Sequence, residues 1–167
     1  MKKFLVMAVM AIMALGVSAQ VYVGGSLGYT HAKTDLGSGD QFTIAPEIGY
    51  NLNDSWAIGA GLNYTWVKDA YNQFEINPYA RYTYFRTDLV SLFVDGGVDL
   101  GFSKPDEGDT SVVWGIGLKP GISLNLNEKF SLVAHMGFIG YQDLKERGKV
   151  YGIDLHNNLS FGFYYNF

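Results

Sequence analysis

Residues 56–66 are WAIGAGLNYTW, and this stretch already indicates the fold class. Large apolar side chains occupy alternate positions between Trp56 and Trp66, and Gly59, Gly61 and Asn63 stand between them. A period of two residues is typical of a β-strand, because successive side chains point to opposite faces of the sheet. The same alternation recurs along the chain and predicts eight strands, at residues 21–30, 42–52, 56–66, 74–86, 90–102, 114–126, 130–138 and 151–167.

The composition agrees with an all-β chain that carries little charge. Of the 167 residues, 16% are aromatic, 21 are glycine and only 17% are charged, whereas a soluble domain carries about 25% charged residues. Tyr and Phe are favoured in strands, and glycine allows backbones to approach closely. The lack of cysteine excludes a disulfide framework, a thiol nucleophile and a cysteine-based zinc site. The net charge of −4 argues against a nucleic-acid partner.

The first 19 residues have the organisation of a secretory signal peptide. A basic start, MKK at 1–3, precedes an uncharged apolar run over 4–17, and VSA at 17–19 supplies the small residues of a cleavage site. We therefore expect residues 1–19 to be removed and the mature chain to begin at Gln20. A single transmembrane anchor is the alternative, but a helical span needs about 20 apolar residues and this run has 14.

The two faces of the predicted strands differ in chemistry. One face carries the large apolar side chains, with aromatic residues gathered near the strand ends. The other face is mostly Gly, Ser, Ala and Asn, and it also carries the seven charged residues of the strand interiors: Glu47, Glu75, Arg81, Asp95, Asp99, Lys119 and Asp154. Strands that are apolar outside and small or polar inside are typical of a transmembrane β-barrel. The alternative, a secreted β-sandwich or lipocalin-like barrel, would have a polar face richer in charge.

The connections between the strands alternate in length. Short turns are expected at residues 53–55, 87–89 and 127–129, and longer polar connections near 34–40, 104–110 and 145–149, with a brief one at 69–73. The segment NLNDSW at 51–56 is echoed by NLNEKF at 125–130, which indicates a repeated hairpin. In transmembrane barrels of this type the short turns are periplasmic and the longer loops extracellular.

The last eight residues, SFGFYYNF at 160–167, carry the most specific motif. Ser160, Gly162, Tyr165 and Phe167 resemble the C-terminal β-signal of bacterial outer-membrane proteins, which has a polar residue, a glycine and two aromatic residues at this spacing. With the predicted signal peptide and strands, the chain resembles the small outer-membrane β-barrel family of Gram-negative bacteria, which includes OmpA- and OmpX-type barrels. The resemblance covers residues 20–167 and implies an all-β fold, an eight-stranded antiparallel up-and-down transmembrane β-barrel.

The resemblance also implies a location and partners. A protein of this family is exported, inserted into the bacterial outer membrane by the barrel assembly machinery, and surrounded there by membrane lipid and lipopolysaccharide. We expect a monomer, and the sequence contains no motif for a cofactor and no metal-ligand spacing.

The charged residues of the inner face predict a blocked lumen. An eight-stranded barrel has an interior just wide enough to be filled by side chains. If the turn at 87–89 has three residues, Arg86 opposes Val90 and Arg81 lies opposite Asp95. Counted from their own turns, Glu47, Lys119 and His135 lie at a similar depth. We therefore predict a lumenal charge network of Glu47, Arg81, Asp95 and Lys119.

The resemblance to OmpA-type barrels, which have lumenal salt bridges, implies the same arrangement. We expect a structural or membrane-integrity role for a barrel closed in this way. The alternative is a narrow pore, which would favour cations because acidic residues outnumber basic ones on the inner face.

Two further functions remain as alternatives. Lipid A-modifying enzymes exist on this scaffold, and here His31 lies near Asp35 while His156 shares a strand face with Asp154 and precedes Ser160. These side chains would point into a blocked lumen, so we predict no catalytic activity. The connections at 104–110 and 144–150 have opposite charges and suggest, as the other alternative, a surface that contacts lipopolysaccharide or a host.

Overall fold

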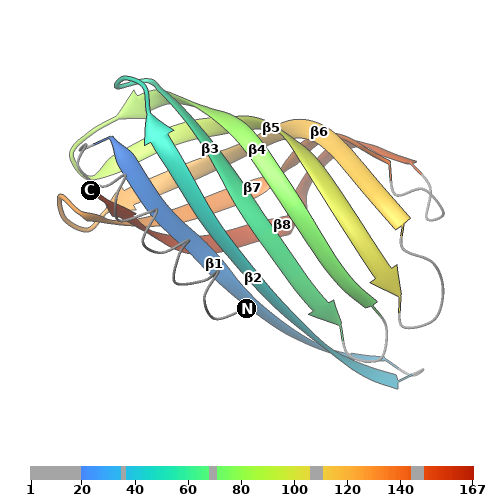
Figure 1. Cartoon of the computed structure of the whole chain (residues 1–167). Helices are drawn as coiled ribbons and strands as arrows, with labels where there is room; N and C mark the ends of the chain where they lie inside the picture. The colour runs from blue at the N-terminus through green and yellow to red at the C-terminus, as the bar shows by residue number, and fades with distance from the viewer. Residues whose placement is uncertain (1–19, 35–36, 68–70, 106–110, 144–148) are drawn as a thin grey trace, which may run out of the picture.

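The computed structural model describes residues 20–34, 37–67, 71–105, 111–143 and 149–167. Within these ranges, eight antiparallel strands follow one another in sequence order and close into a barrel (Figure 1). They are β1 (Val21–Thr34), β2 (Gly37–Asn51), β3 (Trp56–Val67), β4 (Tyr71–Arg86), β5 (Val90–Pro105), β6 (Ser111–Asn125), β7 (Phe130–Asp143) and β8 (Lys149–Asn166). The predicted eight-stranded antiparallel barrel is confirmed. No helix in the described ranges is long and apolar enough to cross a membrane.

The three short turns lie at one end of the barrel, which we call the short-turn end. Here the repeated NLN segment makes the same turn twice. The side-chain oxygen of Asn53 accepts the backbone N–H of Ser55 and of Trp56, both at 2.9 Å. Asn127 accepts the equivalent bonds from the two residues that precede and begin β7. Asn favours such turns because its side chain can replace a backbone acceptor.

At the other end, the strands extend further than the sequence predicted. Residues 34–40 were expected to form a loop, but β1 and β2 stay paired as far as Thr34 opposite Gly37. The segment Gly37–Asp40 lacks apolar alternation, so its sequence resembles a loop. Backbone hydrogen bonding between two strands does not require apolar side chains, and the hairpin therefore continues.

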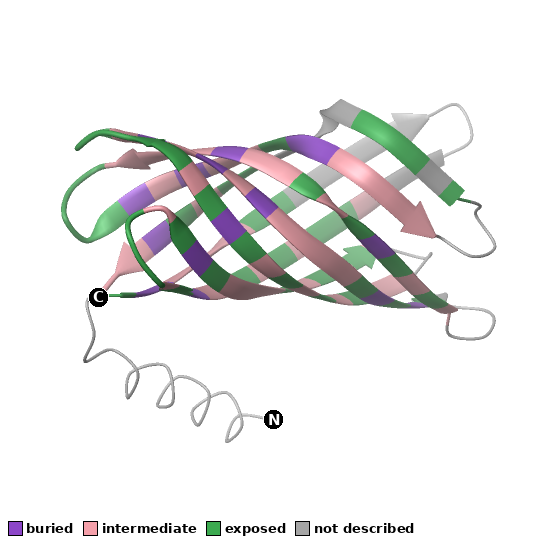
Figure 2. Cartoon of the chain, turned by 90° about the horizontal axis from the view of Figure 1, so that it is seen from above, coloured by how far each residue is buried: buried purple, intermediate pink, exposed green. Residues whose placement is uncertain are grey.

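The outer surface of the barrel is apolar, as the alternation predicted. Large side chains such as Ile58, Leu62 and Trp66 of β3 are exposed, and Figure 2 shows exposed positions recurring along the strands. Aromatic rings pair across neighbouring strands near the ends, including Trp56 with Tyr82 at 4.8 Å between ring centroids. An outer surface of this kind matches the hydrocarbon core of a membrane, and aromatic girdles match its interfaces.

Inside the barrel, aromatic rings lie over glycines of the neighbouring strand. The inward ring of Tyr22 covers Gly49, Tyr79 covers Gly59, Phe93 covers Gly121 and Tyr164 covers Gly24. In each pair the glycine lies directly opposite the aromatic residue in the strand register. A Cβ at any of these glycines would overlap the ring. The narrow lumen therefore holds these four rings because the neighbouring strand carries a glycine opposite each of them.

A β-bulge in β7 changes one predicted orientation. The alternation placed Phe138 on the outer face, but its side chain is buried inside the barrel. In the pairing with β6, three β7 residues, 136–138, lie opposite only two β6 residues, 119–120, and Gly137 has a φ of 84°. This left-handed conformation is accessible to glycine and inserts one extra residue, so the side chains beyond it change faces.

Replacing Gly121 with alanine is expected to destabilise the barrel. The added Cβ would overlap the Phe93 ring and lie 3.0 Å from the Ala134 carbonyl oxygen. Overpacking of this kind costs about 1–3 kcal/mol. The matched control is Gly61→Ala, where the nearest atoms to the new Cβ are at 3.9 Å and a change within about 0.5 kcal/mol is expected. Urea unfolding followed by tryptophan fluorescence gives both values, and equal losses would contradict the aromatic–glycine packing.

Candidate functional site

The centre of the lumen is organised by an ion pair between β4 and β5. Arg81 lies directly opposite Asp95 in the register. Its Nε donates to Asp95 Oδ1 and its Nη2 donates to Asp95 Oδ2, both at 2.7 Å. Two parallel bonds between a guanidinium and a carboxylate are the strongest form of this interaction, and they fix the orientation of both groups.

The register near the turn differs from the one expected. Arg86 pairs with Ser91 and not with Val90, because a bulge between Thr83 and Phe85 shifts the pairing by one residue. The shift lies on the turn side of Arg81, so it leaves the pairing of Arg81 with Asp95 unchanged.

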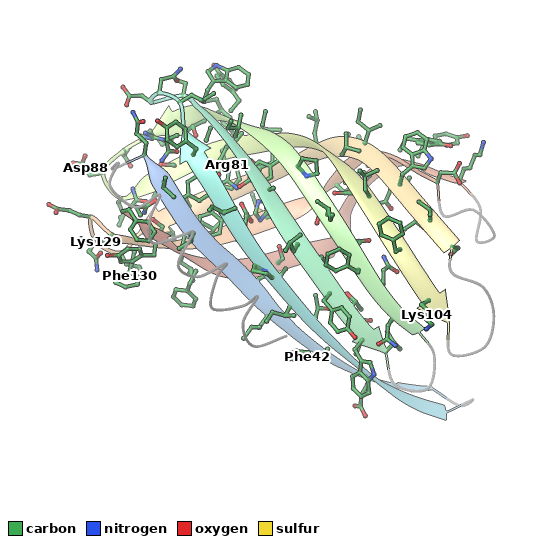
Figure 3. The ribbon with its side chains drawn as sticks, in the orientation of Figure 1. Phe42, Arg81, Asp88, Lys104, Lys129 and Phe130 are labelled. Carbon is green, nitrogen blue, oxygen red and sulfur yellow. The ribbon has the colours of Figure 1, made fainter. Side chains whose placement is uncertain are left out.

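Four aromatic rings surround the Arg81 guanidinium, which Figure 3 shows inside the barrel. Its Cζ lies 3.9 Å from the centre of the Phe93 ring and 5.3–5.5 Å from the centres of three tyrosine rings, those of Tyr22, Tyr79 and Tyr164. Distances below about 6 Å allow cation–π attraction. Arg81 is only 8% exposed and Asp95 only 5%. The rings therefore stabilise the charge and also shield it.

Glu47 and His135 complete the arrangement. Glu47 accepts a hydrogen bond from the Tyr79 hydroxyl and lies 3.5 Å from Arg81 Nη2. His135 Nε2 lies 2.9 Å from the second oxygen of Asp95. We call the whole set the Arg81 layer; its members are Tyr22, Glu47, Tyr79, Arg81, Phe93, Asp95, His135 and Tyr164.

Lys119 lies outside this layer, contrary to the sequence prediction. Its ammonium group contacts Asp99 Oδ1 at 2.8 Å, and Asn77 donates to the same oxygen at 2.7 Å. Although the Lys119 backbone pairs with Asp95, both oxygens of that carboxylate already bind Arg81 or His135. Of the four residues predicted to form one network, the structure therefore groups Glu47, Arg81 and Asp95. It places Lys119 outside that group.

Two cavities lie on either side of the Arg81 layer. One has a volume of about 670 Å³, opens at the short-turn end, and has Tyr22, Arg81 and Phe93 among its lining residues. The other, of about 610 Å³, has Glu47, Asp95 and His135 among its lining residues. We call the second the upper cavity. Opposite sides of one layer thus form the floors of two separate cavities.

Comparisons with known proteins show which family the chain belongs to. No curated protein matches the chain in sequence. The profile of the outer membrane protein β-barrel domain matches residues 4–167. The chain belongs to this family.

Solved structures of outer-membrane barrels share the fold at low sequence identity. Neisserial surface protein A is 21% identical, with a TM-score of 0.57 over 90% of this chain and 98% of that one. The N-terminal barrel of Pseudomonas aeruginosa OprF is 17% identical, with a TM-score of 0.60 over 90% and 98%. Yersinia pestis Ail is 16% identical, with a TM-score of 0.52 over 90% and 100%.

In this outer-membrane barrel, the C-terminal motif lies where the barrel closes. Gly162 faces Ser26 of β1, and a Cβ there would lie 2.7 Å from the Gly25 carbonyl oxygen. The Tyr165 ring packs against Phe130 and Phe167, with centroids 5.2 and 4.9 Å apart. Ser160 pairs with His135 of β7. These contacts give Gly162, Tyr165 and Phe167 a packing role, whereas Ser160 is exposed. The role of the motif in assembly stays a prediction.

The residues weighed for catalysis fall largely outside the described side chains. The side chains of His31, Asp154 and His156 lie in this category, and Asp35 lies outside the described residues altogether. The third histidine, His135, is engaged with Asp95 in the Arg81 layer.

Removing the Arg81 side chain is expected to destabilise this barrel strongly. Arg81→Met leaves Asp95 and Glu47 buried near each other without their cation, and breaking a buried pair in this way costs about 3–5 kcal/mol. Lys119→Met is the matched control, because that ion pair is solvent-accessible, with the lysine side chain 37% exposed, and such pairs contribute about 0–1 kcal/mol. Urea unfolding of both refolded variants measures the difference.

The double variant Arg81→Met with Asp95→Leu also removes one of the two carboxylates that Arg81→Met leaves without a cation. It is expected to recover part of the free energy of unfolding that Arg81→Met loses. If Lys119→Met costs as much as Arg81→Met, the Arg81 layer is not the centre of lumenal stability.

Proposed function

We propose that the protein is a structural barrel of the outer membrane whose lumen is closed to ion flow. The observation that carries this proposal is the Arg81 layer, because its bidentate ion pair and its rings occupy the lumen between two separate cavities. An ion could cross only if the layer opened. That would expose a buried arginine and aspartate whose partners come from four other strands.

The energetic argument supports a layer that stays closed. Separating Arg81 from Asp95 leaves two charges with reduced solvation in a narrow space, which is far less favourable than separating an exposed pair. The surrounding rings cannot retreat easily, because Tyr22, Phe93 and Tyr164 are buried and lie against strand backbones. The layer resembles a small protein core more than the lining of a channel.

The proposal includes a setting for the barrel. The exposed apolar belt supports direct contact with membrane lipid, and the aromatic rings at its ends support contact with lipid and lipopolysaccharide head groups. A cleaved signal peptide at residues 1–19, insertion by the barrel assembly machinery and a monomeric state belong to the same proposal.

Planar-bilayer recording tests the closed lumen. The refolded protein is expected to give no steady conductance, while Arg81→Ser is expected to open the lumen, because the lost side chain leaves space between mutually repelling Asp95 and Glu47. The opened variant should favour cations in a KCl gradient, since Glu75 and Asp99 also line the lumen. Lys119→Gln, which lies outside the layer, is the control and should remain silent.

A steady conductance of the unmodified protein that Arg81→Ser leaves unchanged would contradict the proposal. It would favour the alternative of a constitutive narrow pore whose path avoids the layer.

A further inference from the structure

Two tyrosine hydroxyls and a carboxylate form a hydrogen-bonded chain across the Arg81 layer. Tyr22 of β1 lines the cavity at the short-turn end, whereas Tyr79 of β4 and Glu47 of β2 line the upper cavity. The hydroxyl oxygens of Tyr22 and Tyr79 are 2.7 Å apart, and the Tyr79 hydroxyl donates to Glu47. Three strands thus supply a continuous chain that joins the lining of one cavity to the lining of the other.

The chain has a defined direction. A phenol has a single proton to donate, and Tyr79 donates its proton to Glu47. The bond between the two tyrosines is therefore donated by Tyr22, and the Tyr79 oxygen accepts it. Each hydroxyl can accept a proton from the group before it while it passes its own proton to the group after it. Chains of ionisable side chains in membrane proteins relay protons in this way.

The charge of the layer leaves room for one more proton. An arginine in a narrow pore repels protons, but two carboxylates face the Arg81 guanidinium. Asp95 makes two short bonds with Arg81, while Glu47 contacts it at 3.5 Å. With His135 neutral, one positive and two negative charges give the layer a net charge of −1. A proton on Glu47 neutralises the layer and leaves the pair of Arg81 with Asp95 intact.

Both ends of the chain face polar cavities. The Glu47 side chain is 16% exposed. Gln41, on the same face of β2, also lines the upper cavity and is itself exposed. On the other side of the layer, Asn51 and Thr83 line the cavity with Tyr22. Polar cavities of about 610 and 670 Å³ are large enough to hold water. Water can therefore deliver a proton at one end and remove it at the other.

We propose that the Arg81 layer passes protons between the two cavities along Tyr22, Tyr79 and Glu47 while it excludes hydrated ions. Water at the short-turn end gives a proton to the Tyr22 oxygen as Tyr22 passes its own proton to Tyr79. Tyr79 in turn passes its proton to Glu47. Glu47 then releases a proton to water of the upper cavity, and the two hydroxyls rotate back. Only O–H bonds form and break, so no further reactant is needed.

The path goes beyond the proposed closed lumen and is compatible with it. A hydrated ion needs the layer to open, whereas a proton moves along hydrogen bonds that are already in place. Protons are too dilute at neutral pH to add a measurable current to a recording in KCl. The two proposals therefore require different measurements.

Proton entry into vesicles tests the path. The barrel is refolded into vesicles that contain KCl and the pH-sensitive dye pyranine, and valinomycin lets K⁺ leave to balance the charge. After the external pH is lowered, we expect proton entry several-fold faster than in vesicles without protein. Tyr79→Phe removes one oxygen and keeps the ring over Gly59, and it should return the rate to that of empty vesicles. Tyr82→Phe, on the outer face of the same strand, is the control and should leave the rate unchanged.

Glu47→Gln is the second variant. Its side chain has the same size but cannot take up a proton at neutral pH, so the same loss of proton entry is expected. Heat-modifiable gel migration shows that each variant has folded before its rate is compared.

The same vesicles separate this proposal from the closed lumen. With a protonophore in place of valinomycin, the dye responds only as fast as K⁺ crosses the membrane, and a fast response would contradict the closed lumen. Proton entry that is no faster than in empty vesicles would overturn the proton path and leave the closed lumen standing. Fast entry that Tyr79→Phe or Glu47→Gln leaves unchanged would also overturn the path, because the protons would then cross by another route.

Discussion

A buried guanidinium is costly unless its charge is paired and hydrogen-bonded, and the lumen of this barrel is arranged around that requirement at Arg81. Asp95 takes one edge with two bonds of 2.7 Å, and four aromatic rings lie around the group. These rings fit inside eight strands because the neighbouring strand carries a glycine opposite each ring, as Gly49 and Gly121 show. One ion pair thereby accounts for the inner aromatic residues and for part of the glycine content.

The difference between the outer and inner faces of the strands explains why the chain is poor in charge. The outer face meets hydrocarbon, where charged side chains destabilise the barrel, so its side chains are aliphatic or aromatic. The inner face has room for few large groups, and two of its basic side chains form ion pairs there, Arg81 with Asp95 and Lys119 with Asp99. The chain therefore distributes its residues by strand face, and its low charge content reflects a small surface in contact with bulk water.

The alternation of residues such as those at 56–66 was sufficient to predict the strands and the barrel, and counting from the turn at 87–89 led to the pairing of Arg81 with Asp95. It could not predict the bulge at Gly137, because a positive φ leaves no trace in a two-residue period, and Phe138 was consequently assigned to the wrong face. The aromatic part of the Arg81 layer was also missed. Tyr22 and Tyr164 stand between outward apolar neighbours, and the available signal was a glycine opposite each in the register.

The exchange of the Arg81 Nε–H with solvent measures most directly whether the layer is closed. The chain has only three arginines, Arg81, Arg86 and Arg147, so an arginine-labelled ¹⁵N spectrum gives three Nε signals, and Arg81→Lys assigns the relevant one. In D₂O we expect the Arg81 signal to persist for hours, because its proton is bonded to Asp95 and shielded by rings, while that of the exposed Arg86 disappears at once. Loss of all three signals within the first spectrum would contradict a closed layer.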